Sequence, residues 1–99
     1  MLTFNLKKEW FDKIKSGEKT TEYRIANNYW ITRISNAQNK CDRRFENFDI
    51  KFACGYPSKT DKDEILYAEV LDVYLIENGI NTDLKTNEKV IAINFELYE

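Results

Sequence analysis

The residues best suited to chemistry stand close together in one short segment, residues 17–24. It contains Lys19, Glu22 and Arg24, where a predicted helix gives way to a predicted strand. Side chains two apart on a strand share a face, so Glu22 and Arg24 are expected to lie together. A glutamate can orient a neighbouring guanidinium and leave some of its hydrogens, with the Lys19 ammonium, for an anion or a carbonyl oxygen. The segment predicts a small charged binding site.

Three aromatic residues are candidates to complete that site. Tyr29, Trp30 and Tyr56 are predicted to offer flat surfaces on which a base or sugar can stack. A tryptophan taken alone more often packs in a core, and this alternative stays open for Trp30.

Glu69 is the unusual residue of the apolar run 65–76. Alternation places it on the face of Tyr67 and Leu71, which is expected to be buried. A carboxylate in such surroundings must be paired or protonated. Three readings follow: an ion pair with Lys19 or Arg24 holds the fold together, a bulge turns Glu69 outward, or Glu69 serves the site as an acid, a base or an acceptor.

Composition removes several mechanisms. The 99 residues include no histidine, which excludes a Ser-His-Asp triad, a Cys-His pair and an imidazole zinc site. The two cysteines lack metal-type spacing, so no metal and no cofactor are expected. Net charge is −2 but uneven, because residues 1–44 hold ten Lys and Arg against five Asp and Glu, and the rest hold five against twelve. The basic half suits a phosphate or a short strand, although a solvated mixed-charge surface explains it as well.

The elements that must position these residues follow from hydrophobic periodicity. Strands are predicted at 2–6, 20–25, 48–54, 65–76 with a bend midway, and 90–98; helices are predicted at 7–16 and 29–34, with a basic loop at 35–47. Trp30, Ile31 and Ile34 are expected on the buried stripe of the second helix. The pattern has no βαβ rhythm and favours an α+β fold, a small mixed β-barrel of five to six strands with two short helices.

The length, 99 residues, fits a single domain spanning 1–99. No apolar stretch is long enough to cross a membrane, and the N-terminus lacks the layout of a signal peptide. A cytoplasmic protein without membrane contacts is therefore expected.

The charged segment also resembles the motif of a known domain family. Gly17, Lys19, Glu22 and Arg24 match the four fixed positions of Gly-x-Lys-x-x-Glu-x-Arg, the motif of the ASCH domain in the PUA-like superfamily. The segment follows a strand and a helix ending in Ser-Gly, and Tyr29-Trp30 and the run 52–56 come after it. The resemblance implies a PUA-like barrel with a cleft beside the motif, and binding of RNA or a modified nucleoside or nucleotide.

The same family includes a branch that resembles amidohydrolases acting on acetylated cytidine, with a motif lysine, a threonine nucleophile and a separate glutamate. Lys19 matches the lysine, but Glu22 stands at the nucleophile position and Thr21 is expected on the opposite face. The alternative to a binding module is thus a hydrolase of such an amide or of RNA, with Lys19 as base or electrostatic stabiliser and Glu22 or Glu69 carrying the proton. A third reading is a small domain that binds a protein partner through the acidic segment 61–64.

Overall fold

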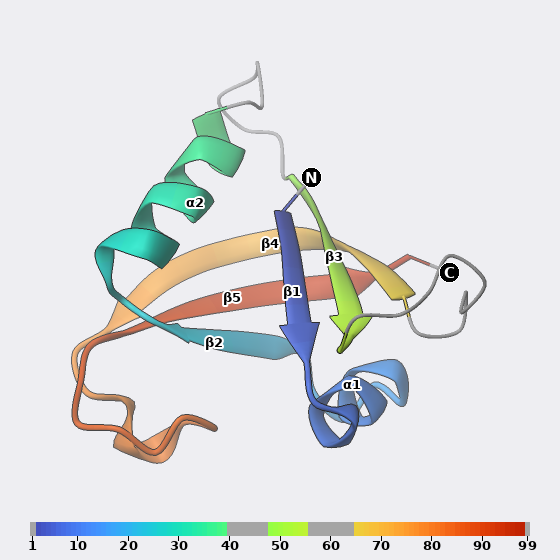
Figure 1. The fold of residues 1–99 in the computed structure, drawn as a ribbon, viewed down its shortest axis with the longest axis horizontal. Helices are drawn as coiled ribbons and strands as arrows, with labels where there is room; N and C mark the ends of the chain where they lie inside the picture. Colours follow the sequence, from blue (N-terminus) through green and yellow to red (C-terminus); the bar gives the residue numbers. More distant parts are fainter. Residues whose placement is uncertain (1, 40–47, 56–64, 99) are drawn as a thin grey trace.

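The residues that the structure describes form a five-stranded mixed sheet with two short helices (Figure 1). The computed structural model describes residues 2–39, 48–55 and 65–98. The strands, in their order across the sheet, are β1 (Leu2–Leu6), β3 (Asp49–Cys54), β4 (Ile65–Ile76), β5 (Val90–Leu97) and β2 (Thr21–Ile25). Only β1 and β3 pair in parallel; the other neighbours are antiparallel.

The sheet curls into a half-barrel. In Figure 1, β1 and β3 cross the direction of β4, β5 and β2, and the long β4 curves between the two groups. The register of β4 against β5 shifts between Val70 and Asp72, the kind of bulge that bends a strand. The predicted midway bend and the predicted α+β barrel-like class are thus confirmed. The curl brings the two edge strands, β1 and β2, near each other at an open seam.

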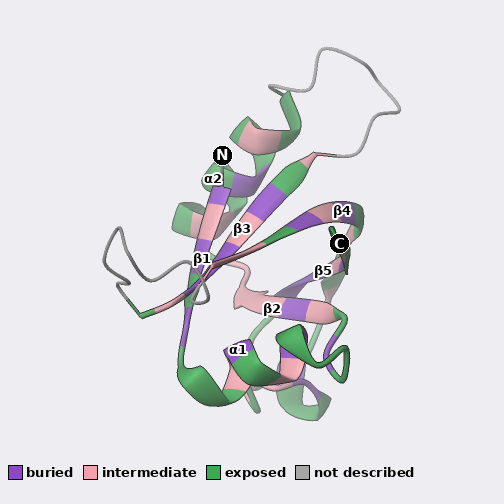
Figure 2. Ribbon diagram, turned by 90° about the vertical axis from the view of Figure 1, so that its right-hand side faces the viewer, coloured by how far each residue is buried: buried purple, intermediate pink, exposed green. Residues whose placement is uncertain are grey.

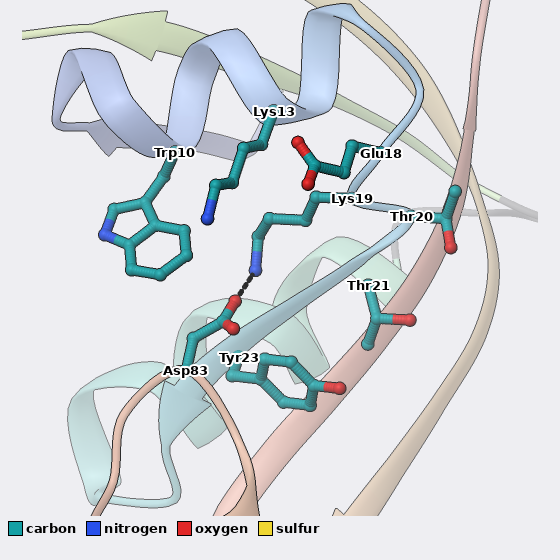
Figure 3. Close-up of a pocket in the computed structure, with 8 residues that line it drawn as sticks. All are labelled: Trp10, Lys13, Glu18, Lys19, Thr20, Thr21, Tyr23 and Asp83. Atoms are coloured by element: carbon teal, nitrogen blue, oxygen red, sulfur yellow. Dashed lines mark hydrogen bonds and ion pairs between the residues drawn. The ribbon is translucent and has the colours of Figure 1, made fainter.

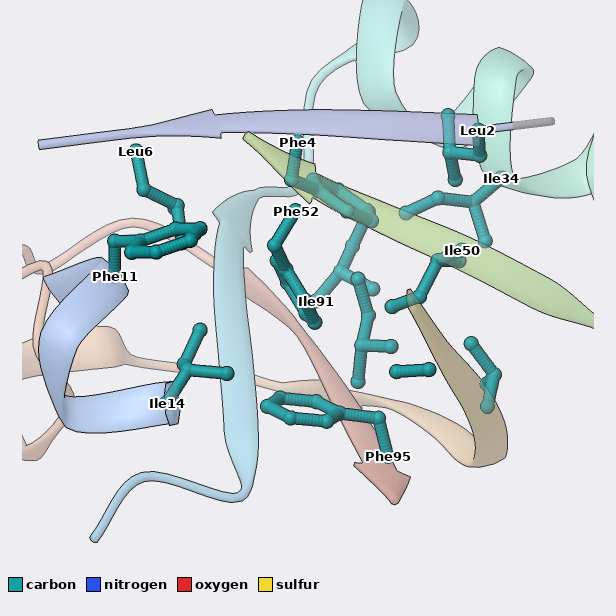
Figure 4. Packing of buried hydrophobic residues seen from close by; sticks show 13 residues of the cluster. Leu2, Phe4, Leu6, Phe11, Ile14, Ile34, Ile50, Phe52, Ile91 and Phe95 are labelled. Atoms are coloured by element: carbon teal, nitrogen blue, oxygen red, sulfur yellow. The ribbon is translucent and has the colours of Figure 1, made fainter. Parts of the chain in front are cut away.

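The apolar core fills the inside of this curl (Figures 2 and 4). Its largest fully buried side chains include Phe4, Phe11 and Phe52, and the rings of Phe52 and Phe95 lie 4.7 Å apart. Alternation along β5 places Ile91, with Phe95, on this inner side. Glu22 and Arg24 of β2 share that inner face, because Glu22 pairs with Ile93 and Arg24 pairs with Ile91 in register.

Helix α1 (Lys8–Lys15) packs Phe11 and Ile14 into the core near the end of β1. It ends before Gly17, whose φ of +85° is the left-handed conformation that glycine adopts most easily. Trp10 lies at the margin of the core and is only partly buried. The turn therefore brings the chain straight into β2 with its charged residues.

Helix α2 (Asn28–Asn39) is longer than predicted. Asn27 caps it, since its Oδ1 accepts a hydrogen bond of 2.9 Å from the amide of Trp30. The predicted end at Ile34 is wrong, because Ala37 also packs on the core and extends the apolar stripe past several weak helix formers. Ile31, expected on that stripe, is 42% exposed. The remainder of the predicted basic loop, 40–47, lies outside the described residues.

A compact segment joins β4 to β5 and folds back toward β2. It contains a short 3₁₀ turn, Gly79–Asn81, and the hydroxyl of Thr82 donates to the carbonyl of Gly79 at 2.7 Å. A Cβ on Gly79 would lie 2.3 Å from a methyl of Val90, so the close approach requires glycine. The segment carries Asp83 to the charged end of β2. Over the described ranges, no helix is long and apolar enough to span a membrane.

Candidate ligand-binding cleft at the open seam

A hollow of about 300 Å³ lies where β2 faces the end of β1. Its lining includes Lys19, Glu22, Arg24, Trp10, Trp30 and Asp83. We call it the seam cleft. At the seam, Nη2 of Arg24 donates to the backbone carbonyl of Asn5 at 3.4 Å, so a side chain spans the gap between the two edge strands. The predicted charged residues therefore converge beside an opening.

Glu22 is the centre of the charged cluster. It is 5% exposed, and one carboxylate oxygen accepts a hydrogen bond of 2.8 Å from the amide of Tyr23. That oxygen lies 3.6 Å from the Lys19 ammonium, and the other lies 3.3 Å from Nη2 of Arg24. A buried carboxylate with these partners holds both cations in fixed positions.

The ammonium group of Lys19 lies among the side chains of Trp10, Tyr23 and Asp83 (Figure 3). Its side chain is 8% exposed and its ammonium donates to the carboxylate of Asp83. The ring centroids of Trp10 and Tyr23 lie 5.4 Å and 5.0 Å from the ammonium nitrogen, within range of cation–π attraction. These contacts make Lys19 an anchor that joins β2 to the β4–β5 connection.

Among the described residues, Arg24 pairs with one carboxylate, whereas Lys19 pairs with two. Its guanidinium carbon lies 5.0 Å from the ring centre of Phe4 and 4.8 Å from that of Trp30. Both of its hydrogen bonds to described residues, to Asn5 and Glu22, start from Nη2. Nε is buried and has no hydrogen-bond partner in the described part of the chain. Nη1 is not buried in this way and makes no hydrogen bond to a described residue, so its donors remain available beside the cleft.

A second hollow, of about 310 Å³, shares Trp10, Lys19, Tyr23 and Asp83 with the seam cleft (Figure 3). Burial is the main cause that raises the pKa of Tyr23, and the charges of Tyr74, Asp83 and Glu22 add to it. The hydroxyl of Tyr23 is therefore neutral at physiological pH.

The structure brings some of the predicted site residues to the cleft and places others elsewhere. Lys19, Glu22 and Arg24 come together, and Trp30 joins them as a partly buried ring that also packs on the core. Tyr29 is 60% exposed and contacts Trp30 edge to face with the centroids 5.1 Å apart. Tyr56 lies outside the described residues.

The prediction that Glu69 shares a buried face was wrong. Ala68 and Val70, its neighbours on either side, point into the core, whereas Tyr67 and Leu71 are 49% and 48% exposed. Apolar residues on both sides of β4 made the two faces indistinguishable by alternation. Glu69 thus belongs to the outer face of the sheet, away from the seam cleft.

Sequence reasoning missed two members of the cluster. Asp83 stands 64 positions from Lys19 in a polar segment with no motif, so only the fold brings the two together. Trp10 has the helical spacing of Phe11 and Ile14, which indicates a core position and hides its part in the cleft. The position of Trp10 at the edge of the apolar stripe of α1 is the feature that could have indicated its role, because a large ring at such an edge can face both core and solvent.

Of the residues named for the hydrolase alternative, Lys19 and Glu22 line the seam cleft, whereas Thr21 and Glu69 do not. The hydroxyl of Thr21 donates to Oδ1 of Asn94 at 2.6 Å, on the face opposite Glu22. Glu69 lies on the outer face, as described above. Within the described segments, no group of three or more His, Cys, Asp or Glu side chains is placed to hold a metal ion.

Comparison with known proteins adds no relative: no protein-family model matches the chain, and no curated protein matches it.

Proposed function

We propose that the seam cleft binds a nucleoside or nucleotide, alone or as part of single-stranded RNA, and that the chain is an ASCH-type domain of the PUA-like superfamily. The observation that carries the proposal is the incomplete hydrogen bonding of Arg24, which lines the cleft beside the rings of Phe4 and Trp30 and bonds to described residues through Nη2 alone. A guanidinium has five N–H donors, so those that Nη2 does not use can meet an acceptor that a ligand supplies.

The charge balance narrows the ligand class. The four charged groups in contact, Lys19, Arg24, Glu22 and Asp83, sum to zero, because two cations meet two carboxylates. A site that neutralises itself lacks the excess charge that a polyphosphate needs. Fixed donors and acceptors in a partly desolvated hollow suit the edge of a base or a sugar hydroxyl.

The two tryptophans of the cleft support this assignment. Trp30 stacks on Phe4 with centroids 5.3 Å apart and planes 19° apart, which fixes its orientation. Trp10 approaches from α1. Rigid aromatic surfaces beside a hydrogen-bonding arginine are a common way of holding an unstacked base.

The first experiment is calorimetric titration with adenosine, cytidine, guanosine, uridine and N4-acetylcytidine, alone and as 5′-monophosphates. We expect at least one to bind, and Arg24→Gln to weaken it about tenfold or more, because hydrogen bonds to a charged group contribute about 1.5–3 kcal/mol. Arg24→Lys keeps the charge but loses the planar fork and should recover only part of the affinity.

Lys15→Gln is the matched control, since Lys15 is exposed on α1 and makes the same change in net charge. Circular dichroism of every variant establishes that it folds. The proposal is wrong if the wild-type protein binds none of these compounds, or if folded Arg24→Gln binds as tightly as wild type.

A further inference from the structure

A series of aromatic rings and arginines leads from the seam cleft outward along the start of α2. Phe4 is fully buried, Trp30 stacks on it, and Tyr29 follows at 60% exposure. Arg24 contacts the faces of Phe4 and Trp30. Arg33 lies 5.2 Å from the ring centre of Tyr29 and 5.7 Å from that of Trp30. Contacts between arginines and aromatic rings thus extend from buried Phe4 to exposed Tyr29.

Arg33 has no carboxylate partner among the described residues, and its side chain is exposed. Helix α2 contains no acidic residue at all, in contrast to α1, where Lys8 pairs with Asp12. Among the residues that the structure describes, the positive charge at the outer end of the series is therefore not balanced by a carboxylate, unlike the self-neutralised cluster at the cleft. An exposed arginine beside an exposed tyrosine is the combination that attracts a phosphate and stacks a base.

The relative orientation of the rings adds a geometric constraint. The planes of Tyr29 and Trp30 are 87° apart, so bases placed on the two rings cannot stack on each other. Single-stranded RNA is commonly recognised with its bases splayed in this way, whereas a duplex keeps them parallel.

We propose that Tyr29 and Arg33 form a second nucleotide position, at which a base stacks on Tyr29 and the phosphate joining it to the nucleotide in the cleft meets Arg33. The ligand is then single-stranded RNA of at least two nucleotides. This inference rests on the proposed function of the cleft and extends it from a monomer to a strand.

The test compares adenosine, cytidine and uridine with the corresponding tetraribonucleotides, titrated into wild type, Tyr29→Ala and Arg33→Gln. We expect tetranucleotides to bind more tightly than nucleosides. Tyr29→Ala should weaken tetranucleotide binding about five- to tenfold, the lower range for loss of a stacked base, and leave nucleoside binding unchanged. Arg33→Gln should lower the salt dependence of log K by about 0.7, the contribution of one phosphate contact on a single strand.

Tyr67→Ala and Lys15→Gln are the matched controls, because Tyr67 is comparably exposed on β4 and Lys15 carries the same charge on α1. A tetranucleotide containing 2-aminopurine gives a direct readout: its fluorescence should be quenched by wild type and regain intensity with Tyr29→Ala. This inference is wrong if nucleosides bind as tightly as tetranucleotides. It is also wrong if the control variants lose as much affinity as the test variants. In both cases the proposed function of the cleft would still stand. Failure of every nucleoside and tetranucleotide to bind would overturn the proposed function, and this inference with it.

Discussion

The two cations of the motif lie at opposite sides of Glu22 and differ in how far the protein satisfies them. Lys19 meets two carboxylates and two aromatic rings, and is 8% exposed. Arg24 meets one carboxylate and one backbone carbonyl through a single nitrogen, and is 20% exposed. The two cations of one motif are thus held differently: Lys19 joins the β4–β5 connection to β2, and Arg24 retains donors that the proposed ligand would use.

The largest expected effect comes from removing the anchor. Lys19→Met leaves the carboxylates of Glu22 and Asp83 without their shared cation. Breaking a buried ion pair by deleting one partner costs about 3–5 kcal/mol, and the lower end applies here because Asp83 is partly exposed. Chemical denaturation should therefore show a loss of about 3 kcal/mol in the free energy of unfolding.

Arg24→Met serves as the comparison for that experiment. Its loss of unfolding free energy should be about 1 kcal/mol, since its hydrogen bonds are long and partly exposed. If Arg24→Met destabilises the protein as much as Lys19→Met does, then Arg24 is an anchor like Lys19, and the distinction between the two cations is wrong.

A smaller effect is expected from Asp83→Asn, which keeps the shape of the side chain and removes its charge. Because Asp83 is about one-third exposed, we expect a loss of roughly 1 kcal/mol in unfolding free energy. The double variant with Lys19→Met should lose less than the two single losses together, because the two residues share one interaction. Strict additivity would show that the Lys19–Asp83 contact contributes nothing to stability.

The smallest effect concerns tyrosine ionisation beside the anchor. The pKa of Tyr23 is raised in the folded state, mainly by burial. Its contribution to stability is therefore complete below the unfolded-state pKa of about 10 and is lost as pH rises through the raised folded value. Denaturation followed against pH should show stability falling above about pH 10, and Tyr23→Phe should reduce that fall.

Tyr98 offers a control for this titration. Its hydrogen bond to the Asp49 carboxylate raises its pKa to about 12, and Tyr23 is not among the causes of this shift. Tyrosinate absorbance of Tyr23→Phe should retain this late step, and Tyr98→Phe should remove it. Loss of the late step in Tyr23→Phe would show that the substitution disturbs the whole fold and cannot report on the ionisation of Tyr23 alone.

Much of the fold followed from the sequence because its signals are local. Alternation located the strands, and the helix predicted to end in Ser-Gly does end before Gly17. The same alternation correctly placed Glu22 and Arg24 on one face. These inferences required only the geometry of a single strand or helix, which neighbouring residues determine.

The tertiary structure determined the features that local sequence patterns do not specify, namely which face of a strand is buried and which distant residues meet. The buried face of β4 depended on which side the other strands cover, and Glu69 therefore fell outside the site. Asp83 reaches Lys19 only because the sheet curls and the β4–β5 connection folds back. The sequence determined which charges stand together on β2, whereas long-range packing determined that one of them is saturated and the other retains free donors beside a cleft.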